Sequence, residues 1–283
     1  SITVKSSVHG TYYVWGYGDF DVSKALIQPC IFIKCDSEVD LLTKFLTHWS
    51  NPIHMPDVIT GWNIRFFDIP YLVNRSAKIV GLEAIKKFSP WGLIDYREIV
   101  RRGRKEDTYD IKGVNQMDYL ELFQKFGYSY GAQESYKLDH IAHVVLGEKK
   151  LSFEESGSLR NLYKDDYQRY IDYNMKDVEL VDRLEDKMGL ITLAMTVAYK
   201  GGVNYGDTFG TTAIWESIIY RKLLSLRKVP PLDVPPAQKS TFAGGYVKEP
   251  QVGLHDWVVS FDLNSLYPNI IVQCNMSPET LID

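Results

Sequence analysis

Apolar and polar positions recur with helical or strand-like periods along the first two thirds of the chain. From residue 38 to residue 49 the apolar side chains recur at helical spacing, with Asp36 or Ser37 available as the N-terminal cap, so the pattern predicts a helix. A second helix is predicted over 68–80, where Pro70 is tolerated in the first turn. Short apolar runs bounded by turn residues predict strands at 12–15, 31–34 and 57–63.

The alternation of strands and helices predicts an α/β (α+β) fold with a mixed sheet flanked by helices, whose chemistry lies at the carboxyl ends of strands. Two strand-like runs within 94–114 flank the charged stretch 101–107, which predicts a β-hairpin with a basic tip. Further helices are expected over 117–126, 159–190 (as one or two helices) and 212–226.

Glycines after residue 189 and a group of prolines around residue 235 change the character of the chain. We therefore expect boundaries near residues 190 and 234. The expected parts are 1–190, 191–233 and 234–283.

Composition is that of a folded protein. A chain of 283 residues suffices for one large domain or two ordinary ones, and a hydrophobic share of 45% excludes wholesale disorder. The net charge of −4 argues mildly against indiscriminate nucleic-acid binding, although an enzyme that holds divalent metal ions needs clustered acids and can still carry a local basic groove. Three scattered cysteines indicate a reducing cytosol, and neither a signal peptide nor a transmembrane run is present, so no membrane partner is expected.

Two acids are placed where helices can aim them into a cleft. Asp68 follows a predicted strand at the first turn of a helix, where its carboxylate could bind Mg²⁺ or Mn²⁺ or could simply cap the helix. Tyr173 and Asp177 are four residues apart, so a helix places a phenol and a carboxylate on one face. Such a pair could hold a metal ion and hydrogen-bond an attacking water, and an incidental surface pair is the alternative.

The most specific motif spans residues 260–271. A buried strand predicted at 257–261 delivers Asp262 at its end, and a turn rich in backbone amides precedes Tyr267. An acid beside exposed amides suits a metal-bound triphosphate. The alternative is a helix cap at Asp262 with Tyr267 in the core.

These motifs resemble those of the family B DNA polymerases. The run Asp262-x-x-Ser265-Leu266-Tyr267-Pro268 is similar to polymerase motif A, whereas 63–68 and 173–177 are similar to the second and third exonuclease motifs. The order and spacing, with 242–250 and 277–280, most resemble the replicative polymerases of T-even-type bacteriophages. Secondary matches lie at 117–119 and 135–139, and the resemblance covers essentially the whole chain.

The resemblance implies a ribonuclease-H-like 3′→5′ exonuclease domain, a helical connecting segment and the beginning of a polymerase palm. Asp68 and Asp177 would be exonuclease metal ligands, and Tyr173 would orient the nucleophilic water. Asp262 would bind Mg²⁺ at the polymerase site, and Tyr267 would exclude a ribose 2′-hydroxyl. The implied nucleotide contacts are made by Leu263, Ser265 and Leu266, and the implied DNA contacts by Asn63, Arg101, Arg102, Arg104, Gly244, Gly245 and Tyr246. For the arginines, a solvated loop is the alternative.

The family's first exonuclease motif and second polymerase carboxylate motif are absent from the sequence, whose two ends suggest an internal piece of a longer protein. Two-metal catalysis needs carboxylates that hold ions about 3.5–4 Å apart. We therefore expect the piece alone to be inactive. Milder departures are Asn269, where serine is usual, and Phe242, where tyrosine is usual.

The implied partners are primer–template DNA, single-stranded 3′ ends, deoxynucleoside triphosphates, a sliding clamp and other replisome proteins. The implied cofactors are two Mg²⁺ (or Mn²⁺) ions per active site in the complete protein, and the implied location is the host-cell cytoplasm, as a viral protein. Two alternatives stay open: a stand-alone ribonuclease-H-like exonuclease, and a catalytically inactive DNA-binding module derived from a polymerase.

Overall fold

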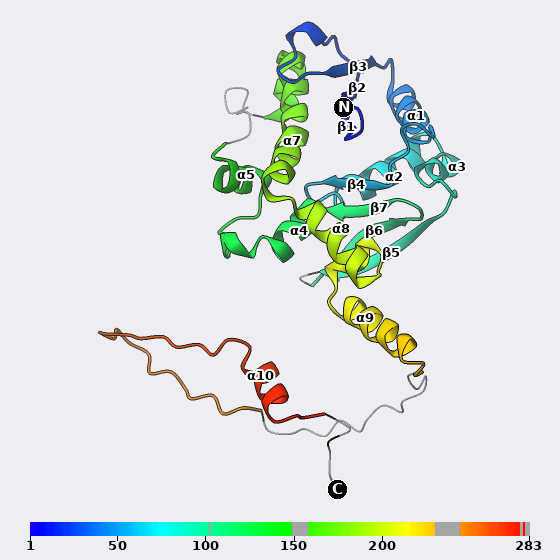
Figure 1. Cartoon of the computed structure of the whole chain (residues 1–283). Coiled ribbons are helices and arrows are strands. Elements are labelled where there is room, and N and C mark those ends of the chain that lie inside the picture. Colours follow the sequence, from blue (N-terminus) through cyan, green and yellow to red (C-terminus); the bar gives the residue numbers. More distant parts are fainter. Residues whose placement is uncertain (102, 149–157, 230–243, 278–279, 281–283) are drawn as a thin grey trace. The chain divides into compact units, whose positions relative to one another are not determined.

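The computed structural model describes residues 1–101, 103–148, 158–229, 244–277 and 280 (Figure 1). The chain divides into two units, Ser1–Pro230 and Pro231–Asp283. The strands and α-helices of the first unit are β1 (Ile2–Lys5), β2 (Tyr12–Gly16), β3 (Cys30–Lys34), α1 (Glu38–Trp49), β4 (Val58–Gly61), α2 (Asp68–Ile79), α3 (Leu82–Ile85), β5 (Ile94–Arg101), β6 (Arg104–Ile111), β7 (Asn115–Asp118), α4 (Tyr119–Phe126), α5 (Leu138–Leu146), α6 (Leu159–Asp165), α7 (Tyr167–Met188), α8 (Leu190–Gly201) and α9 (Thr212–Ser225). The expected three-part division of the chain stays a prediction.

The first sheet has helices on both faces. Strand β2 pairs antiparallel with β1 and parallel with β3. Because successive strand residues point to opposite faces, Trp15 contacts Phe45 of α1, with ring centroids 5.2 Å apart. Val14 faces the other way and shares a buried cluster with Ile171 and Met175 of α7. This arrangement fixes α7 against the sheet (Figure 1).

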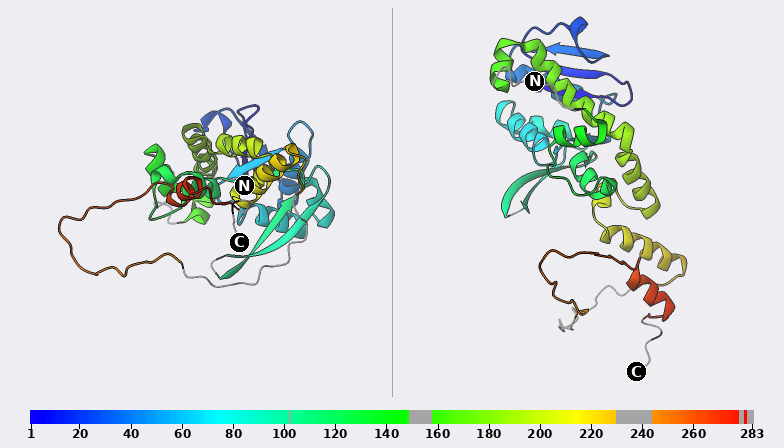
Figure 2. Two further views of the ribbon diagram at one scale, coloured as in Figure 1. Left: turned by 60° about the horizontal axis from the view of Figure 1, so that its bottom comes forward. Right: turned by 90° about the vertical axis from the view of Figure 1, so that its left-hand side faces the viewer.

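Two further sheets replace the single mixed sheet that the sequence predicts. Strand β4 pairs in parallel with β7, and β5 with β6 forms an antiparallel hairpin that stands as a separate two-stranded ribbon (Figure 2). No ladder joins the three sheets within the described ranges. They are connected instead through packed side chains. Ile111, the last residue of β6, belongs to the same buried cluster as Trp15 of β2. The fold is therefore mixed α/β with small sheets.

The predicted hairpin is present, but its tip is shorter than expected. Arg101 pairs with Arg104 in the ladder, so Lys105 lies within β6 and forms an ion pair with Glu98 at 2.7 Å. Arg102 lies outside the described residues, as do the side chains of Arg101 and Arg104. The predicted phosphate contact of these arginines stays a prediction.

Most predicted helices are confirmed, but the segment 117–126 was assigned wrongly. Helix α1 begins and ends as expected, with Ser37 as its cap. Within 117–126, Met117 and Asp118 end strand β7, and the helix begins only at Tyr119. The helical spacing of the apolar residues continues across this junction, whereas the parallel pairing with β4 holds the first two residues extended.

Helix α7 links two buried clusters across its 22 residues. Its first half contacts the first sheet through Ile171 and Met175. Its second half places Leu180 and Leu184 in a cluster with α4, α5 and α8. Helices α5 and α8 were not predicted as elements, although α8 buries Leu190, Ala194 and Ala198 at intervals of four.

The second unit is extended over most of its described length, and α10 (Leu266–Gln273) is the helix found there. The buried strand predicted at 257–261 is not formed. Its residues are not buried either, since Trp257 is 99% and Phe261 is 92% exposed. A strand needs a neighbouring strand to satisfy its backbone groups. The described residues of this unit provide none.

Among the helices that the structure describes, none combines the length and the apolar character needed to span a bilayer.

Candidate functional site

Asp68 is the first residue of α2, directly after the loop that leaves β4. In that loop Asn63 has a left-handed backbone, with φ of 64°. The cap position falls on Phe67, which makes no capping side-chain bond. Since helix N-termini favour negative charge, the position suits a carboxylate.

Two other acids act electrostatically on Asp68. Burial among protein atoms raises the pKa of Asp68 to about 6, a hydrogen bond to its own backbone amide opposes this shift, and the negative charges of Asp118 and Asp177 raise the pKa further. Solvent nevertheless reaches the side chain of Asp68. Because the charge of Asp177 contributes to the raised pKa of Asp68, Asp177 of α7 lies within electrostatic reach of Asp68.

Tyr173 and Asp177 both lie on α7, as the four-residue spacing predicts. In and next to this region, the helix buries Met175 in one apolar cluster and Leu180 in another. Asp68 and Asp177 are more than a hundred residues apart in sequence, so only the packing of α7 brings them near each other. The predicted roles of Tyr173 and Asp177 stay predictions.

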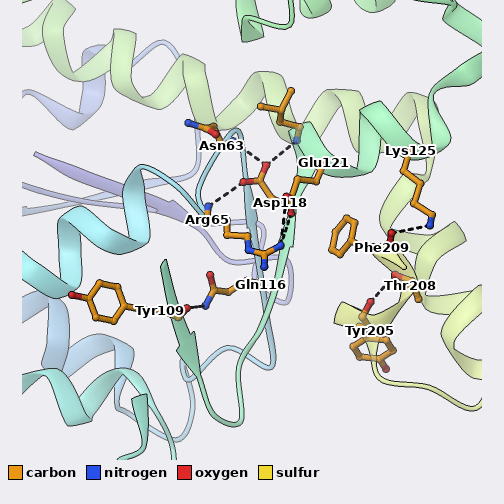
Figure 3. Close-up of polar contacts among 11 residues, drawn as sticks. Asn63, Arg65, Tyr109, Gln116, Asp118, Glu121, Lys125, Tyr205, Thr208 and Phe209 are labelled. Atoms are coloured by element: carbon orange, nitrogen blue, oxygen red, sulfur yellow. Dashed lines mark hydrogen bonds and ion pairs between the residues drawn. The ribbon is translucent and has the colours of Figure 1, made fainter. Parts of the chain in front are cut away.

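Asp118 is the residue that sequence reasoning missed as part of this site. It ends β7 and is fully buried, with 0% of its surface exposed. Its Oδ1 accepts hydrogen bonds from the backbone amides of Asn63 and Leu120, and its Oδ2 accepts one from the amide of Arg65, each at 3.0 Å (Figure 3). The available signal was the secondary motif match at 117–119, because β7 contains no apolar run and the helical assignment of 117–126 concealed the strand.

The surroundings of Asp118 raise the pKa of its carboxyl group overall. Burial raises the pKa of Asp118, whereas the amide of Arg65 lowers it; the charge of Glu121 raises it, and the amides of Asn63 and Leu120 lower it. Hydrogen bonds from backbone amides are the interaction that stabilises a buried carboxylate. The carboxylate of Asp118 therefore binds backbone amides of the loop between β4 and α2.

Asp68 and Asp177 offer carboxylate oxygens, which are the ligand type of a divalent-cation site. Carboxylate oxygens are the ligands that Mg²⁺ and Mn²⁺ prefer, and gathered carboxylates are stabilised by a cation. Over the described ranges, however, no group of three or more His, Cys, Asp or Glu side chains has an arrangement that could hold a metal ion. The two acids fit part of a ligand set.

The motif of the second unit forms a turn followed by a helix. Ser265 has a left-handed backbone, with φ of 52°, and Leu266 and Tyr267 open α10. Asn269, which stands where the resembled family has serine, donates from Nδ2 to the carbonyl oxygen of Asn264 at 3.0 Å and so closes this turn.

The side chains of this motif lie on the surface of the second unit. Asp262 and Leu263 are exposed, and so is Tyr267 at 74%. The cap position belongs to Ser265 and Tyr267 is exposed, so the alternative of a cap at Asp262 with Tyr267 in the core does not describe the unit.

The segment with Gly244, Gly245 and Tyr246 is extended and exposed. A Cβ atom at Gly245 would lie 3.8 Å from the hydroxyl oxygen of Tyr267. Two predicted contact regions, one for DNA and one for the nucleotide, thus lie side by side in the second unit.

Two family profiles match the chain. The profile described as "DNA polymerase family B, exonuclease domain" matches residues 16–141, which include Asp68 and Asp118, and "DNA polymerase family B" matches residues 210–283, which include Asp262 and Tyr267. The chain belongs to the family B DNA polymerases. Helix α7, with Tyr173 and Asp177, lies between the two matched ranges.

Curated relatives support the assignment along nearly the whole chain. The chain is 33% identical over 264 residues to the DNA-directed DNA polymerase of Enterobacteria phage T4, covering 93% of this chain and 29% of the relative. The corresponding protein of Escherichia phage RB69 is 34% identical over 265 residues, covering 93% of this chain and 28% of the relative. The DNA polymerase delta catalytic subunit of Candida albicans is 31% identical over 252 residues, covering 84% of this chain and 24% of the relative. This family B polymerase chain thus spans less than a third of these relatives' length.

Proposed function

We propose that this chain contributes the larger part of a proofreading 3′→5′ exonuclease site and the first part of a polymerase site to a DNA-directed DNA polymerase that replicates viral DNA. The observation that carries the proposal is that α7 brings Asp177 within electrostatic reach of Asp68, at the N-terminus of α2. Membership of family B and the phage relatives support the substrate class.

In the exonuclease half, Asp68 and Asp177 hold divalent ions and Tyr173 hydrogen-bonds the attacking water. Bound Mg²⁺ or Mn²⁺, two ions per site in the complete protein, supplies the charge stabilisation that phosphoryl transfer needs. Asn63 and the arginines of the β5–β6 hairpin contact the single-stranded 3′ end. The two acids lie on separate helices, α2 and α7, so the tertiary structure of the first unit sets their separation.

In the polymerase half, Asp262 is one of the carboxylates that bind Mg²⁺. The turn over residues 263–266 directs backbone amides at the triphosphate, and Tyr267 lies beneath the sugar. The segment 244–246 contacts the template strand. The partners are primer–template DNA and deoxynucleoside triphosphates, with a sliding clamp and other replisome proteins, in the host-cell cytoplasm.

The test is Asp177→Ala in the full-length protein that contains this chain. Loss of a metal ligand removes transition-state charge stabilisation, so excision of single-stranded DNA should fall about a thousandfold while nucleotide addition stays near normal. Tyr173→Phe should have a smaller effect, because it removes one hydrogen bond and leaves the carboxylates in place. Single-turnover excision and primer extension measure the two activities separately.

Asp186→Ala is the matched control, since Asp186 is an exposed carboxylate on the same helix. It should leave both activities unchanged. Loss of synthesis with normal excision in Asp177→Ala would show that the two sites have been assigned the wrong way round.

A further inference from the structure

We propose that Asp118 is a positioning residue of the exonuclease site, whose buried carboxylate holds the β4–α2 loop in the conformation that presents Asp68. The inference rests on the proposed exonuclease function. Asp118 has no exposed surface, and both of its carboxylate oxygens accept hydrogen bonds from backbone amides.

The geometry of the loop shows how one carboxylate controls it. In the parallel pairing of β4 and β7, Gly61 lies opposite Asp118, so the chain leaves β4 beside the carboxylate. The amides of Asn63 and Arg65 then donate to Oδ1 and Oδ2, both at 3.0 Å (Figure 3). A Cβ atom at Gly61 would lie 2.5 Å from Cγ2 of Ile64, so the turn is tight. The two hydrogen-bonded amides and the left-handed backbone of Asn63 restrict the conformation of the loop that precedes Asp68.

Asp118 also connects this loop to the helices that carry Asp177. Its third hydrogen bond, from the amide of Leu120 at 3.0 Å, caps α4. Helix α4 buries Tyr119 and Phe123 in the same cluster as Leu184 of α7. The carboxylate therefore joins the loop before Asp68 to the helical layer that holds Asp177, and this connection sets how far apart the two acids lie.

Only a carboxylate can make this set of bonds. Its two oxygens accept from three amides, whereas an asparagine offers one oxygen and turns an NH₂ group toward an amide that also donates. A buried donor left without an acceptor is costly. Asp118→Asn keeps the shape of the side chain and removes one acceptor and the charge, which makes it the sharpest substitution.

The nearby ion pair of Arg65 and Glu121 supplies a matched control. The Arg65 guanidinium approaches Glu121 at 3.2 Å, so this pair links the same loop to the same helix through side chains alone. Glu121→Gln removes a negative charge three residues from Asp118 and leaves all three backbone bonds in place. It should leave excision unchanged.

The experiment uses the full-length protein, with single-turnover excision of single-stranded DNA measured over a range of Mg²⁺ concentrations. Residues that orient metal ligands typically change metal affinity or activity about 10–100-fold. Asp118→Asn should therefore lower the excision rate constant and raise the half-saturating Mg²⁺ concentration, together by a factor in this range, with the KM for DNA and primer extension little changed. Hydrogen exchange of the loop amides should accelerate, while α1 and β2 stay protected.

A purely structural role would lower the thermal midpoint and the active fraction but leave the half-saturating Mg²⁺ concentration unchanged, and that result overturns the proposal. If Asp118→Asn unfolds the domain, Asp118→Glu, which keeps the charge and both oxygens but lengthens the side chain, answers the same question by its Mg²⁺ dependence. Asp68→Ala is measured in parallel. If Asp68→Ala retains excision, the proposed function fails; if it abolishes excision while both Asp118 variants keep a normal Mg²⁺ dependence, only the positioning role fails.

Discussion

The two motif-bearing turns of this chain have similar backbones and different surroundings. Asn63 and Ser265 both adopt a left-handed conformation shortly before a helix, with φ of 64° and 52°. The first turn is anchored by a buried acid from another strand. The second is closed by Asn269 of its own helix.

This difference separates local from tertiary structure. Sequence near the motif is sufficient to form a turn and start a helix in both units. Placement of a reactive side chain against a partner from a distant segment requires packing, which the first unit provides through α7 and the second unit does not provide within its described residues. The comparison also predicts that the two regions respond differently to substitution.

The largest expected difference is in stability. Phe45 is 1% exposed and contacts Trp15, whereas Phe261 is 92% exposed. In the 283-residue chain, Phe45→Ala should lower the free energy of unfolding by about 3–5 kcal/mol, and Phe261→Ala should change it by less than about 0.5 kcal/mol. Denaturant unfolding followed by fluorescence measures both. An equal loss for the two variants would show that residues near 261 are packed in solution and would break the comparison.

Sugar selectivity gives the next largest effect. If the ring of Tyr267 lies beneath the deoxyribose, Tyr267→Ala in the full-length protein should lower discrimination against ribonucleotides about a hundredfold, because a steric collision discriminates more strongly than a loose pocket. Deoxynucleotide use should suffer less. Steady-state incorporation of dATP and ATP measures the ratio.

Tyr199→Ala is the control for this substitution, since Tyr199 is an exposed tyrosine of α8 at 87%. It should leave the sugar ratio unchanged. If Tyr267→Ala also leaves the ratio unchanged, the steric-exclusion role of Tyr267 is lost.

The smallest expected effect is the pH dependence of the packed unit. The rings of His48 and His54 stack at 4.0 Å, and burial, followed by the charge of His54, lowers the pKa of His48 to about 4. The unfolded chain binds a proton near the ordinary histidine pKa of about 6.5, before the folded chain does. Stability should therefore fall as the pH drops from about 6.5 to 4.

Thermal midpoints measured across this pH range test the assignment. His48→Phe keeps an aromatic ring but removes the titrating group, so it should flatten the decline. His255→Gln alters an exposed histidine of the second unit and should leave the decline as it is. A steeper or unchanged decline in His48→Phe would contradict the proposed origin.

Comparison of predicted and observed elements shows which parts of the fold local sequence patterns can predict. Helix α1 was predicted to the residue, because a capping serine and a continuous apolar face specify it locally. The segment 117–126 was misassigned, because its first two residues are held extended by pairing with β4, more than fifty residues away in sequence. The predicted strand at 257–261 has the right local character but no neighbouring strand among the described residues.

The sequence by itself determined the family, the order of the motifs and the placement of Tyr173 and Asp177 on one helix, because these depend on residue type and short-range spacing. Only the tertiary structure decided that the charge of Asp177 contributes to the raised pKa of Asp68 and that Asp118 accepts hydrogen bonds from the loop between β4 and α2. The physical reason is that a buried carboxylate is stabilised and held in position by the backbone amides that donate hydrogen bonds to it. Those amides come from segments that sequence spacing does not relate to one another.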